Sequence, residues 1–392
     1  MNRRAALFSG RRIGLVVNQA DFLISHRYEL ACALRDLGAE LTIFCPAASG
    51  EEKLIESGFR VVTYPLSRSG RNPFAEILSL LSLSRLYRDH PLDLVHHVTI
   101  KPVLYGTRAA RKRGIPAVVN AIPGLGFVYT AEGFFAALRR ATTNLLYRSF
   151  TRHPAIRVIF QNSEDRDAFV RRRLVSAVDA VIIRGSSMNL ATFSTSEAPP
   201  EPVSFLLIGR MLADKGVREY VNAARLLRRD HPEWCFRLLG GLDTGNPSAI
   251  GKDELEAWHN EGIDWLGHRS DVADQIRAHH VVVLPSYREG MPKTLLEATA
   301  CGRPIITTDI PGCRDIVRDG VNGLLVQPRV VTELAEAMRT LGEDGALRDQ
   351  MGRAGRTRAM AFSVEDVVER TLRIYATLLH EQHHGSTEEV IA

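Results

Sequence analysis

The 392-residue sequence has no apolar stretch approaching the roughly 18 residues that a membrane-spanning helix needs. Its start, MNRRAALFSGRRIGLVVNQ, runs from basic residues into an apolar segment typical of a β-strand, without the apolar block and cleavage site of a secretory signal. Both absences argue against a transmembrane or exported protein. We therefore expect a cytoplasmic protein.

Cysteines are few, and their spacing shows no pairing. The chain has five of them, an odd number, and none forms a Cys-x-x-Cys pair. This argues against a disulfide framework and a structural zinc site, and it is typical of a reducing compartment. We expect small core residues at Cys32, Cys45, Cys235, Cys301 and Cys313.

Acidic residues are in short supply in the first half of the chain. Residues 1–190 contain 27 Lys or Arg and 15 Asp or Glu, whereas the remainder contains 23 and 30. The basic half should therefore face an anion: nucleic acid, phospholipid headgroups or a diphosphate-bearing substrate. No RNA- or DNA-binding motif accompanies these charges, which disfavours nucleic acid.

The length of the chain exceeds what one hydrophobic core usually organises. The segment STSEAPPEPV, residues 194–203, holds three prolines and no apolar periodicity, so we interpret it as a linker. It separates an expected N-terminal domain, 1–193, from a C-terminal domain, 204–363. A helix at about 364–382 is expected to pack back on the first domain.

Short apolar segments alternate with helical patterns on both sides of this linker. In the first half they lie at 12–18, 40–46, 93–99, 117–122, 157–162 and 180–185, and in the second at 203–210, 235–241, 263–267, 280–286, 304–309 and 322–326. This alternation predicts two doubly wound α/β domains with parallel sheets. A helix at 25–38, with Ser25 as N-cap, joins the first two strands. Ligands of such sheets bind beyond the carboxyl ends of the strands, which selects the loops after Asn18, Val98, Gly209, Gly241 and Ser286.

Two carboxylates stand eight positions apart in PSYREGMPKTLLEATACGRP, residues 285–304. Pro292 suits the first position of a helix, so Glu289 should lie on the loop after a strand and Glu297 more than a turn inside the helix, with its side chain leaning back toward the helix start. Both side chains can then reach one ligand. The backbone NH groups between them form a positive helix end suited to phosphate or sugar hydroxyls, near Gly290, Met291, Lys293 and Thr294.

A second loop carries two cations. LLIGRMLADKGVREYVNAARLL places Arg210 just past a strand and Lys215 five positions later, before a helix. Two cations in such a loop can neutralise a diphosphate that gains charge as a glycosidic bond breaks. Gly209, at the end of that strand, is also expected to contact the ligand.

Together these segments, within about residues 205–330, resemble the C-terminal domain of the family 4 glycosyltransferases. These are retaining enzymes of the GT-B fold, in which two Rossmann-like domains face a central cleft. The resemblance implies that Glu289 contacts the donor sugar, that Glu297 holds its ribose hydroxyls and that Arg210 and Lys215 clamp its diphosphate. It also implies that LGHR, with Gly267, His268 and Arg269, lines the nucleobase pocket.

The N-terminal half narrows the resemblance. DFLISHRYELACAL, VHHVTIKPVLYGTRAARKRGIP and NAIPGLGFVYT resemble the branch that acts on undecaprenyl-diphosphate-linked sugars, including N-acetylgalactosaminyltransferases. NQADFLISH stands where the family usually has a glycine pair. The resemblance implies acceptor contacts, with Lys101 and Arg27 facing the acceptor's diphosphate, at Asn18, Ser25, His26, Arg27, Lys101, Gly124 and Gly126.

Two adjacent histidines end the strand at 93–97. Matching family members place a sugar-contacting histidine here, and we expect His97 to be that catalytic-site residue. His96 is its rival, because alternation along a strand points the two side chains to opposite faces. A packed core histidine is an equally good interpretation of either.

A membrane-linked acceptor would explain the basic first half. The segment 134–157 is a basic amphipathic helix pattern that can lie in an anionic membrane interface, or pack on the core, and 74–90 is a second candidate. In the first segment, apolar residues alternate with arginines: Phe134, Phe135, Leu138, Leu145 and Leu146 with Arg139, Arg140, Arg148, Arg152 and Arg157. We expect peripheral contact with the inner face of the cytoplasmic membrane.

The resemblance thus implies a retaining, metal-independent transfer of a sugar, an N-acetylhexosamine or a related one, from a UDP-type nucleotide sugar to an undecaprenyl-diphosphate-linked saccharide. The nucleotide sugar is a substrate, and no cofactor is implied. The Glu-Asp-Arg-Asp pattern at 164–167 resembles a metal-binding Asp-x-Asp but lies in a polar helix start. A nucleotide-sugar 2-epimerase of the same fold, or a non-catalytic sugar-nucleotide or glycan-binding subunit, are the alternatives.

Overall fold

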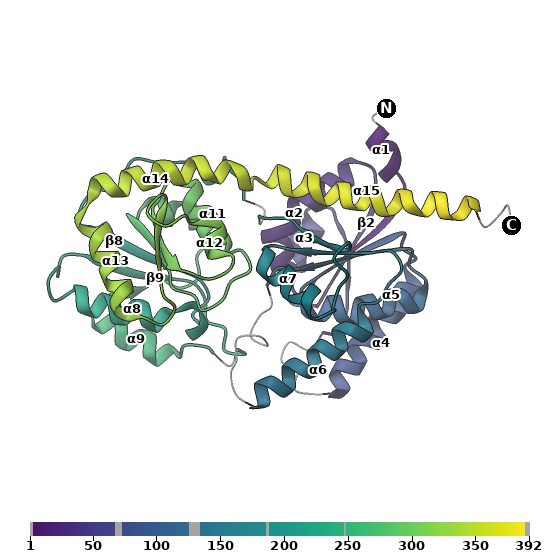
Figure 1. Ribbon diagram of the computed structural model, residues 1–392, viewed down its shortest axis with the longest axis horizontal. Coiled ribbons are helices and arrows are strands. Elements are labelled where there is room, and N and C mark those ends of the chain that lie inside the picture. The colour runs from purple at the N-terminus through teal and green to yellow at the C-terminus, as the bar shows by residue number, and fades with distance from the viewer. Residues whose placement is uncertain (1–2, 67–72, 125–133, 186–187, 247, 389–392) are drawn as a thin grey trace. The chain divides into compact units, whose positions relative to one another are not determined.

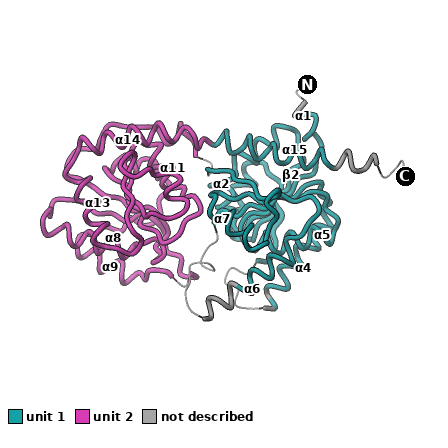
Figure 2. Tube along the Cα trace, viewed as in Figure 1, with its two compact units in different colours: residues 1–187, 364–392 teal, residues 188–363 magenta. Residues whose placement is uncertain are grey.

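The computed structural model describes residues 3–66, 73–124, 134–185, 188–246 and 248–388 (Figure 1). The chain divides into two compact units, shown in separate colours in Figure 2. Unit 1 comprises residues 1–187 and 364–392, and unit 2 comprises residues 188–363. Both are α/β units, which confirms the predicted fold class.

The expected linker lies inside unit 2 and is tied to it. Arg303 donates from Nη2 to Ser196 Oγ at 2.7 Å and to the Glu197 carbonyl oxygen at 2.8 Å. Arg303 itself is buried. One arginine thus fixes a polar, proline-rich segment, and the composition of that segment does not reveal this contact. The boundary between the two units falls at 187/188 instead of at 193.

The sheet of unit 1 has seven parallel strands among the described residues, in the order β3-β2-β1-β4-β5-β6-β7. They are β1 (Arg12–Val16), β2 (Glu40–Cys45), β3 (Arg60–Thr63), β4 (Leu94–Val98), β5 (Ala117–Ile122), β6 (Ile156–Phe160) and β7 (Ala180–Ile182). Val16 of β1 is in register with Phe44 of β2 on one side and with His97 of β4 on the other. The strand order therefore reverses between β1 and β4, the switch point at which open sheets bind ligands.

Helices cover both faces of this sheet. One face packs against α1 (Arg3–Phe8), α2 (Ala20–Asp36), α3 (Glu51–Glu56) and the C-terminal helix α15 (Val364–Glu388). The other packs against α4 (Pro73–Asp89), the π-helical turn η1 (Pro102–Gly106), α5 (Thr107–Arg113), α6 (Phe134–Phe150) and α7 (Ser163–Arg171). Figure 1 shows α15 running along unit 1 beside α2.

In the described part of unit 2, the sheet has six parallel strands in the order β10-β9-β8-β11-β12-β13. They are β8 (Ser204–Ile208), β9 (Cys235–Leu239), β10 (Ile263–Trp265), β11 (Val281–Leu284), β12 (Ile305–Thr308) and β13 (Gly323–Val326). The helices are α8 (Val217–Leu227), α9 (Lys252–Asn260), α10 (Val272–Arg277), α11 (Lys293–Ala300), α12 (Cys313–Ile316), α13 (Val331–Glu343) and α14 (Gly345–Ala359).

Strand β8 shows why these strands are continuously apolar in sequence. All five of its residues are buried. Phe205 and Leu207 join the core on one face, while Leu206 and Ile208 join the core on the other. Full burial of each such side chain is worth about 1.5–3 kcal/mol, so helices must cover both faces.

Three local expectations differ from the structure. Strand β3 was not expected, because two of its residues are exposed, the other two are half-buried, and they give no apolar run. Helix α2 begins at Ala20 rather than Ser25, because its N-cap Gln19 makes no side-chain capping bond that the sequence could signal. The helix expected at 134–157 ends at Phe150 and is followed by β6. Each expected strand is present.

Two further features follow from the described residues. The cysteines are all free, with Cys45, Cys301 and Cys313 buried and the other two half-buried. Among the helices described, none combines the length and the apolar composition that crossing a bilayer requires.

Candidate active site

The strand order of unit 2 reverses between β8 and β11, so the loops after these strands flank its ligand-binding edge. Two glycines allow close packing there. A Cβ on Gly216 (φ 72°) would lie 2.1 Å from the Pro285 carbonyl oxygen, and one on Gly240 (φ 150°) would lie 1.7 Å from the Gly209 carbonyl oxygen. Only glycine fits at these approaches, and the segment that carries both predicted cations is therefore fixed at this edge.

Lys215 and Glu289 form an ion pair at the reversal of strand order. Lys215 ends a 3-10 turn before α8, and Glu289 lies in the loop after β11, so two neighbouring strands bring them together. Ser286 Oγ donates to the same oxygen of Glu289 at 2.6 Å. The Lys215 and Glu289 side chains are 23% and 11% exposed, so their attraction is less screened than that of a surface pair.

Arg210 lies at the carboxyl end of β8, but its side chain has a different partner. Its Nη1 donates to Asp243 Oδ2 at 2.5 Å, and 57% of the side chain is exposed. Asp243 follows β9, so this pair also lies at the carboxyl ends of the strands. Of the two predicted cations, Lys215 is thus joined to Glu289, whereas Arg210 is joined to a carboxylate that sequence reasoning missed.

Glu297 lies in the second turn of α11 and is 7% exposed. Lys293 Nζ is 3.3 Å from its carboxylate oxygen. Burial raises the pKa of Glu297, and the charge of Lys293 opposes that shift. Pro292 is the N-cap of α11 instead of its first helical residue, with extended backbone angles. A buried carboxylate beside a helix start is a suitable acceptor for ligand hydroxyls.

The turn between the two glutamates is packed tightly. Met291 is buried in the core of unit 2, and Thr294 Oγ1 donates to the Ile208 carbonyl oxygen at 3.4 Å. A Cβ on Gly312 (φ 80°) would lie 2.2 Å from the Gly290 carbonyl oxygen. Gly312 is therefore a residue on which the site's shape depends and which sequence reasoning missed, although the Pro-Gly pair at 311–312 is a turn signal.

The predicted nucleobase loop follows β10 at the same edge of the sheet. Gly267 (φ 69°) accepts a hydrogen bond from the Gly240 amide at 2.9 Å, which joins this loop to the end of β9. His268 is exposed. Arg269 donates to both oxygens of Asp271, at 2.8 and 2.7 Å, and this hydrogen bonding lowers the pKa of Asp271.

The corresponding edge of unit 1 holds two unsatisfied polar atoms. Asn18 follows β1 and Thr99 follows β4. The Oδ1 atom of Asn18 and the Oγ1 atom of Thr99 are buried and have no hydrogen-bond partner in the described structure. Thr99 also has a left-handed backbone (φ 75°), which costs roughly 1–2 kcal/mol for such a residue. Unpaired polar atoms and strain at a switch point favour a ligand-binding role. Asn18 was predicted, and Thr99 begins the loop after Val98 that the strand pattern selects, although Thr99 itself was not named.

The structure corrects the expectation for His97. Its ring is fully buried, with Nδ1 2.8 Å from Asn120 Oδ1 and Nε2 2.9 Å from the Tyr87 hydroxyl. Gly106 of η1 covers the ring, because a Cβ there would lie 2.3 Å from it. Burial lowers the pKa of His97 to about 3, so it is neutral at physiological pH. His97 is a core residue with both ring nitrogens satisfied, and it is not presented to a sugar.

His96 points to the opposite face, as alternation requires. Its Nδ1 is 2.6 Å from the Tyr375 hydroxyl of α15, while its buried Nε2 has no partner among the described residues. Burial lowers the pKa of His96, and the charge of Arg27 adds to that shift. Arg27 is itself buried, and its Nη1 donates to the His26 carbonyl oxygen at 2.8 Å. This corrects the expectation that Arg27 is offered to a diphosphate.

The other predicted acceptor residues are placed as follows. Ser25 Oγ lies 2.6 Å from His26 Nδ1 and donates to the Asp21 carbonyl oxygen at 2.8 Å, both within α2. Lys101 forms an ion pair of 2.7 Å with Glu76 of α4. Gly124 follows β5 at the carboxyl-end edge. Gly126 lies outside the described residues.

The fold is that of a two-domain α/β protein with candidate ligand-binding loops at the carboxyl ends of its strands, and the comparisons show its family. Residues 25–185 match the family model described as glycosyl transferase 4-like domain, and residues 202–344 match that described as glycosyl transferases group 1. The chain belongs to these glycosyltransferases and is an enzyme of that class.

Among individual proteins, the chain is similar to N,N'-diacetylbacillosaminyl-diphospho-undecaprenol alpha-1,3-N-acetylgalactosaminyltransferase of Campylobacter jejuni. The two are 28% identical over 93% of this chain and 98% of that protein. It is also 22% identical to UDP-Gal:alpha-D-GlcNAc-diphosphoundecaprenol alpha-1,3-galactosyltransferase of Escherichia coli, over 79% of this chain and 81% of that one.

Solved structures show the same GT-B fold. Sucrose-phosphate synthase from Thermosynechococcus elongatus matches 95% of this chain and all of its own, with a TM-score of 0.79 and 21% identity. Anabaena HepE, solved in complex with UDP and glucose, matches 93% of this chain and all of its own, with a TM-score of 0.75 and 19% identity. The predicted fold and enzyme class are thereby confirmed.

Proposed function

We propose that this glycosyltransferase moves a sugar, with retention of anomeric configuration, from a UDP-type nucleotide sugar bound to unit 2. The observation that carries the proposal is the Lys215–Glu289 ion pair at the carboxyl ends of β8 and β11. It places a cation for the diphosphate beside a carboxylate for the sugar. Glu297, buried in α11 behind the same loop, is the proposed acceptor for the ribose hydroxyls.

The proposed reaction breaks the bond between the anomeric carbon and the diphosphate oxygen and forms a bond from the acceptor oxygen on the same face. The acceptor's proton passes to the leaving diphosphate. Glu289 is a poor nucleophile for a double displacement, because one of its oxygens accepts from both Lys215 and Ser286. Lys215 and Arg210 are the proposed stabilisers of the leaving group, so that neither a metal ion nor a cofactor is required.

We propose that the acceptor is a saccharide linked to undecaprenyl diphosphate. Two similar proteins carry such acceptors in their names, and one of them transfers N-acetylgalactosamine. The excess of basic residues over residues 1–190 suits a diphosphate on a lipid. An N-acetylhexosamine or a related sugar is the proposed donor group, and the unsatisfied atoms of Asn18 and Thr99 are the proposed acceptor-side contacts.

A lipid-linked acceptor also requires contact with a membrane, and α4 is the proposed contact. Four apolar side chains at helical spacing are exposed on this helix, by 78%, 54%, 60% and 43%: Phe74, Ile77, Leu78 and Leu81. Exposed Arg85 and Arg88 continue the same face. Residues 73–157 contain twelve Lys or Arg and four Asp or Glu, which favours an anionic bilayer.

In the other predicted segment, Leu145 of α6 is 65% exposed, and the side chains of residues 134–140 lie outside the described ones. The apolar surface of α4 is therefore the better-defined candidate for insertion. The proposed location is the inner face of the cytoplasmic membrane.

A donor panel tests the proposed function. The full chain is incubated with UDP-sugars in the presence and absence of an undecaprenyl-diphosphate saccharide, and the products are resolved by mass spectrometry and NMR. We expect a glycolipid with the donor's anomeric configuration, formed only with acceptor. A free isomerised nucleotide sugar would identify a 2-epimerase instead, and donor binding without any product would identify a non-catalytic subunit.

A further inference from the structure

A cavity lies in unit 1, away from the carboxyl ends of its strands. Its volume is about 670 Å³, within the range typical of small-molecule sites. Ile156, the first residue of β6, and Asp179, just before β7, both line it. The cavity therefore opens at the amino ends of these strands, the edge opposite to Asn18 and Thr99, and it is separate from the proposed acceptor site.

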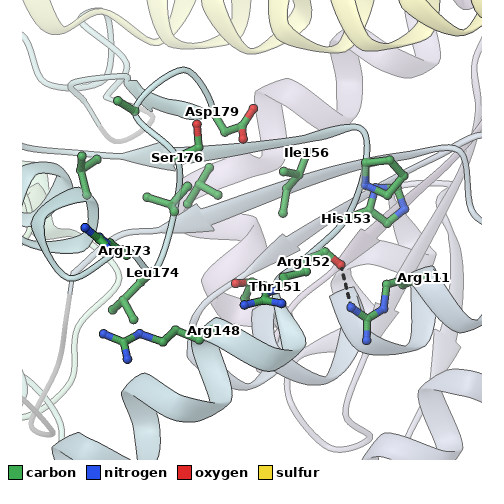
Figure 3. Close-up of a pocket in the computed structure, with 15 residues that line it drawn as sticks. Arg111, Arg148, Thr151, Arg152, His153, Ile156, Arg173, Leu174, Ser176 and Asp179 are labelled. Carbon is green, nitrogen blue, oxygen red and sulfur yellow. Dashed lines mark hydrogen bonds between the residues drawn. The ribbon is translucent and has the colours of Figure 1, made fainter.

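The lining of this cavity is strongly cationic. Figure 3 shows arginine side chains reaching it from separate elements: Arg111 from α5, Arg148 from α6, Arg152 from the following turn and Arg173 from the segment after α7. None of the four has an ion-pair partner in the described part of the chain. Arg111 and Arg148 donate only to backbone carbonyl oxygens, those of Arg152 at 3.4 Å and Arg172 at 2.9 Å.

The cavity's acidic side chain does not neutralise them. Asp179 is the only carboxylate among the described lining residues, and it is 3.4 Å from Arg157, which does not line the cavity. Burial lowers the pKa of His153, also in the wall, and its ring nitrogens bond the backbone at Ile115 and Ala155. The cavity thus presents an excess of guanidinium groups that lack anions.

Arg173 supplies an independent observation. Its backbone is left-handed (φ 54°), and the Leu174 amide donates to the Phe169 carbonyl oxygen at 2.9 Å. This is the Schellman ending of α7, in which the left-handed position is usually glycine. An arginine there carries backbone strain that glycine would avoid, and strain of this kind is a pointer to function.

The chemistry of the lining indicates the ligand. Guanidinium groups bind phosphate oxygens through paired, charge-assisted hydrogen bonds. The floor is apolar, formed in part by Ile156, Val158 and Leu174, so a phosphate attached to a carbon skeleton would fill the cavity better than a bare ion. We propose that this arginine cavity is a binding site for a phosphate ester, which is either the headgroup of an anionic lipid or a water-soluble phosphate compound.

The test uses the full chain in a Lys215→Ala background, so that phosphate binding at the strand ends of unit 2 does not contribute. Two variants probe the cavity, Arg152→Gln and Arg173→Gly, alone and together. The matched control is the Arg229→Gln/Arg353→Gln pair, which removes two exposed arginines of unit 2. Arg173→Gly separates the two roles of that residue, because it should keep or raise the thermal unfolding midpoint while removing a ligand contact.

Two arms distinguish the sources of phosphate. Titration calorimetry measures glycerol 1-phosphate, and vesicle sedimentation compares phosphatidylcholine with an equal mixture of phosphatidylcholine and phosphatidylglycerol. We expect each cavity variant to weaken binding about tenfold relative to the control in at least one arm. Loss in the first arm identifies a soluble phosphate ester, and loss confined to the second identifies a lipid headgroup. Binding in both arms that matches the control pair would overturn the proposal.

Discussion

Lys215 and Glu289 join the loops of the two strands between which the sheet of unit 2 reverses its order. The pair is preformed and mostly shielded from water. Replacing Lys215 by Ala removes the cation proposed for the leaving diphosphate, and we expect kcat to fall about 10²–10³-fold. Steady-state transfer assays measure this, with the exposed Lys252→Ala as control. Near-normal turnover of Lys215→Ala would remove it from this role.

Arg210 and Asp243 allow a graded comparison. If Arg210 leaves Asp243 to contact the diphosphate, Arg210→Ala should lower kcat strongly, while Asp243→Asn should leave most of the activity because it frees the guanidinium. Transfer assays on both variants decide this. Equal losses in the two variants would show that the ion pair itself, and not the arginine alone, is what activity requires.

Glu297 should make stability depend on pH in a direction that is unusual for a carboxylate. Its pKa is raised in the folded chain by burial, so between the unfolded and the folded pKa the folded state binds more protons than the unfolded state. Its contribution to the free energy of unfolding is therefore favourable below the unfolded pKa and declines as pH rises through the folded one. Relative to wild type, Glu297→Gln should raise the thermal unfolding midpoint more at pH 8 than at pH 4. The same variant should weaken donor binding. A midpoint difference between wild type and variant that is constant with pH would contradict this.

His97 should contribute to the stability of the fold through packing. Because its pKa is about 3, no activity step between pH 5 and 8 should arise from its titration. Gly106→Ala would place a Cβ 2.3 Å from the ring and should cost about 1–3 kcal/mol in the free energy of unfolding. In a His97→Ala background the same change should cost less. Denaturant unfolding of the four chains measures the coupling, and additive costs would mean that the ring does not set the fit of Gly106.

The apolar face of α4 should govern vesicle binding. The triple change Ile77→Ser, Leu78→Ser and Leu81→Ser removes exposed apolar area without disturbing the core, so sedimentation with anionic vesicles should fall about tenfold or more. The matched control is Ile55→Ser, Leu226→Ser and Val321→Ser, three exposed apolar residues elsewhere. Equal vesicle binding by the two triple variants would exclude α4 as the contact.

Much of the fold could be predicted because its signals are local. Strands buried on both faces are continuous apolar runs, as in β8, and these runs also predict where the loops after them lie. The positions of Lys215 and Glu289 followed, since each is fixed by its distance from a strand end. Strand β3 and the start of α2 were missed because neither carries a strong local signal.

The sequence does not predict which side chains form hydrogen bonds with each other. Arg210 bonds Asp243, 33 positions away, and His96 bonds Tyr375, 279 positions away. Such pairs depend on which elements pack together, and neither spacing nor composition records that. The same holds for the arginine cavity, whose lining residues come from α5, α6, β6, α7 and the segments that follow α6 and α7.

The amino-acid sequence by itself determined the two parallel sheets, the enzyme family and the loops at which ligands should bind, because apolar periodicity and short motifs act over a few residues. Only the tertiary structure decided which side chains those loops present. His97 and Arg27 look like ligand contacts in sequence, but His97 is buried against Gly106, Tyr87 and Asn120, and Arg27 is buried in α2, which packs against α15. Whether a side chain is buried depends on how helices and sheets pack together, so this property can be assigned only from the folded structure.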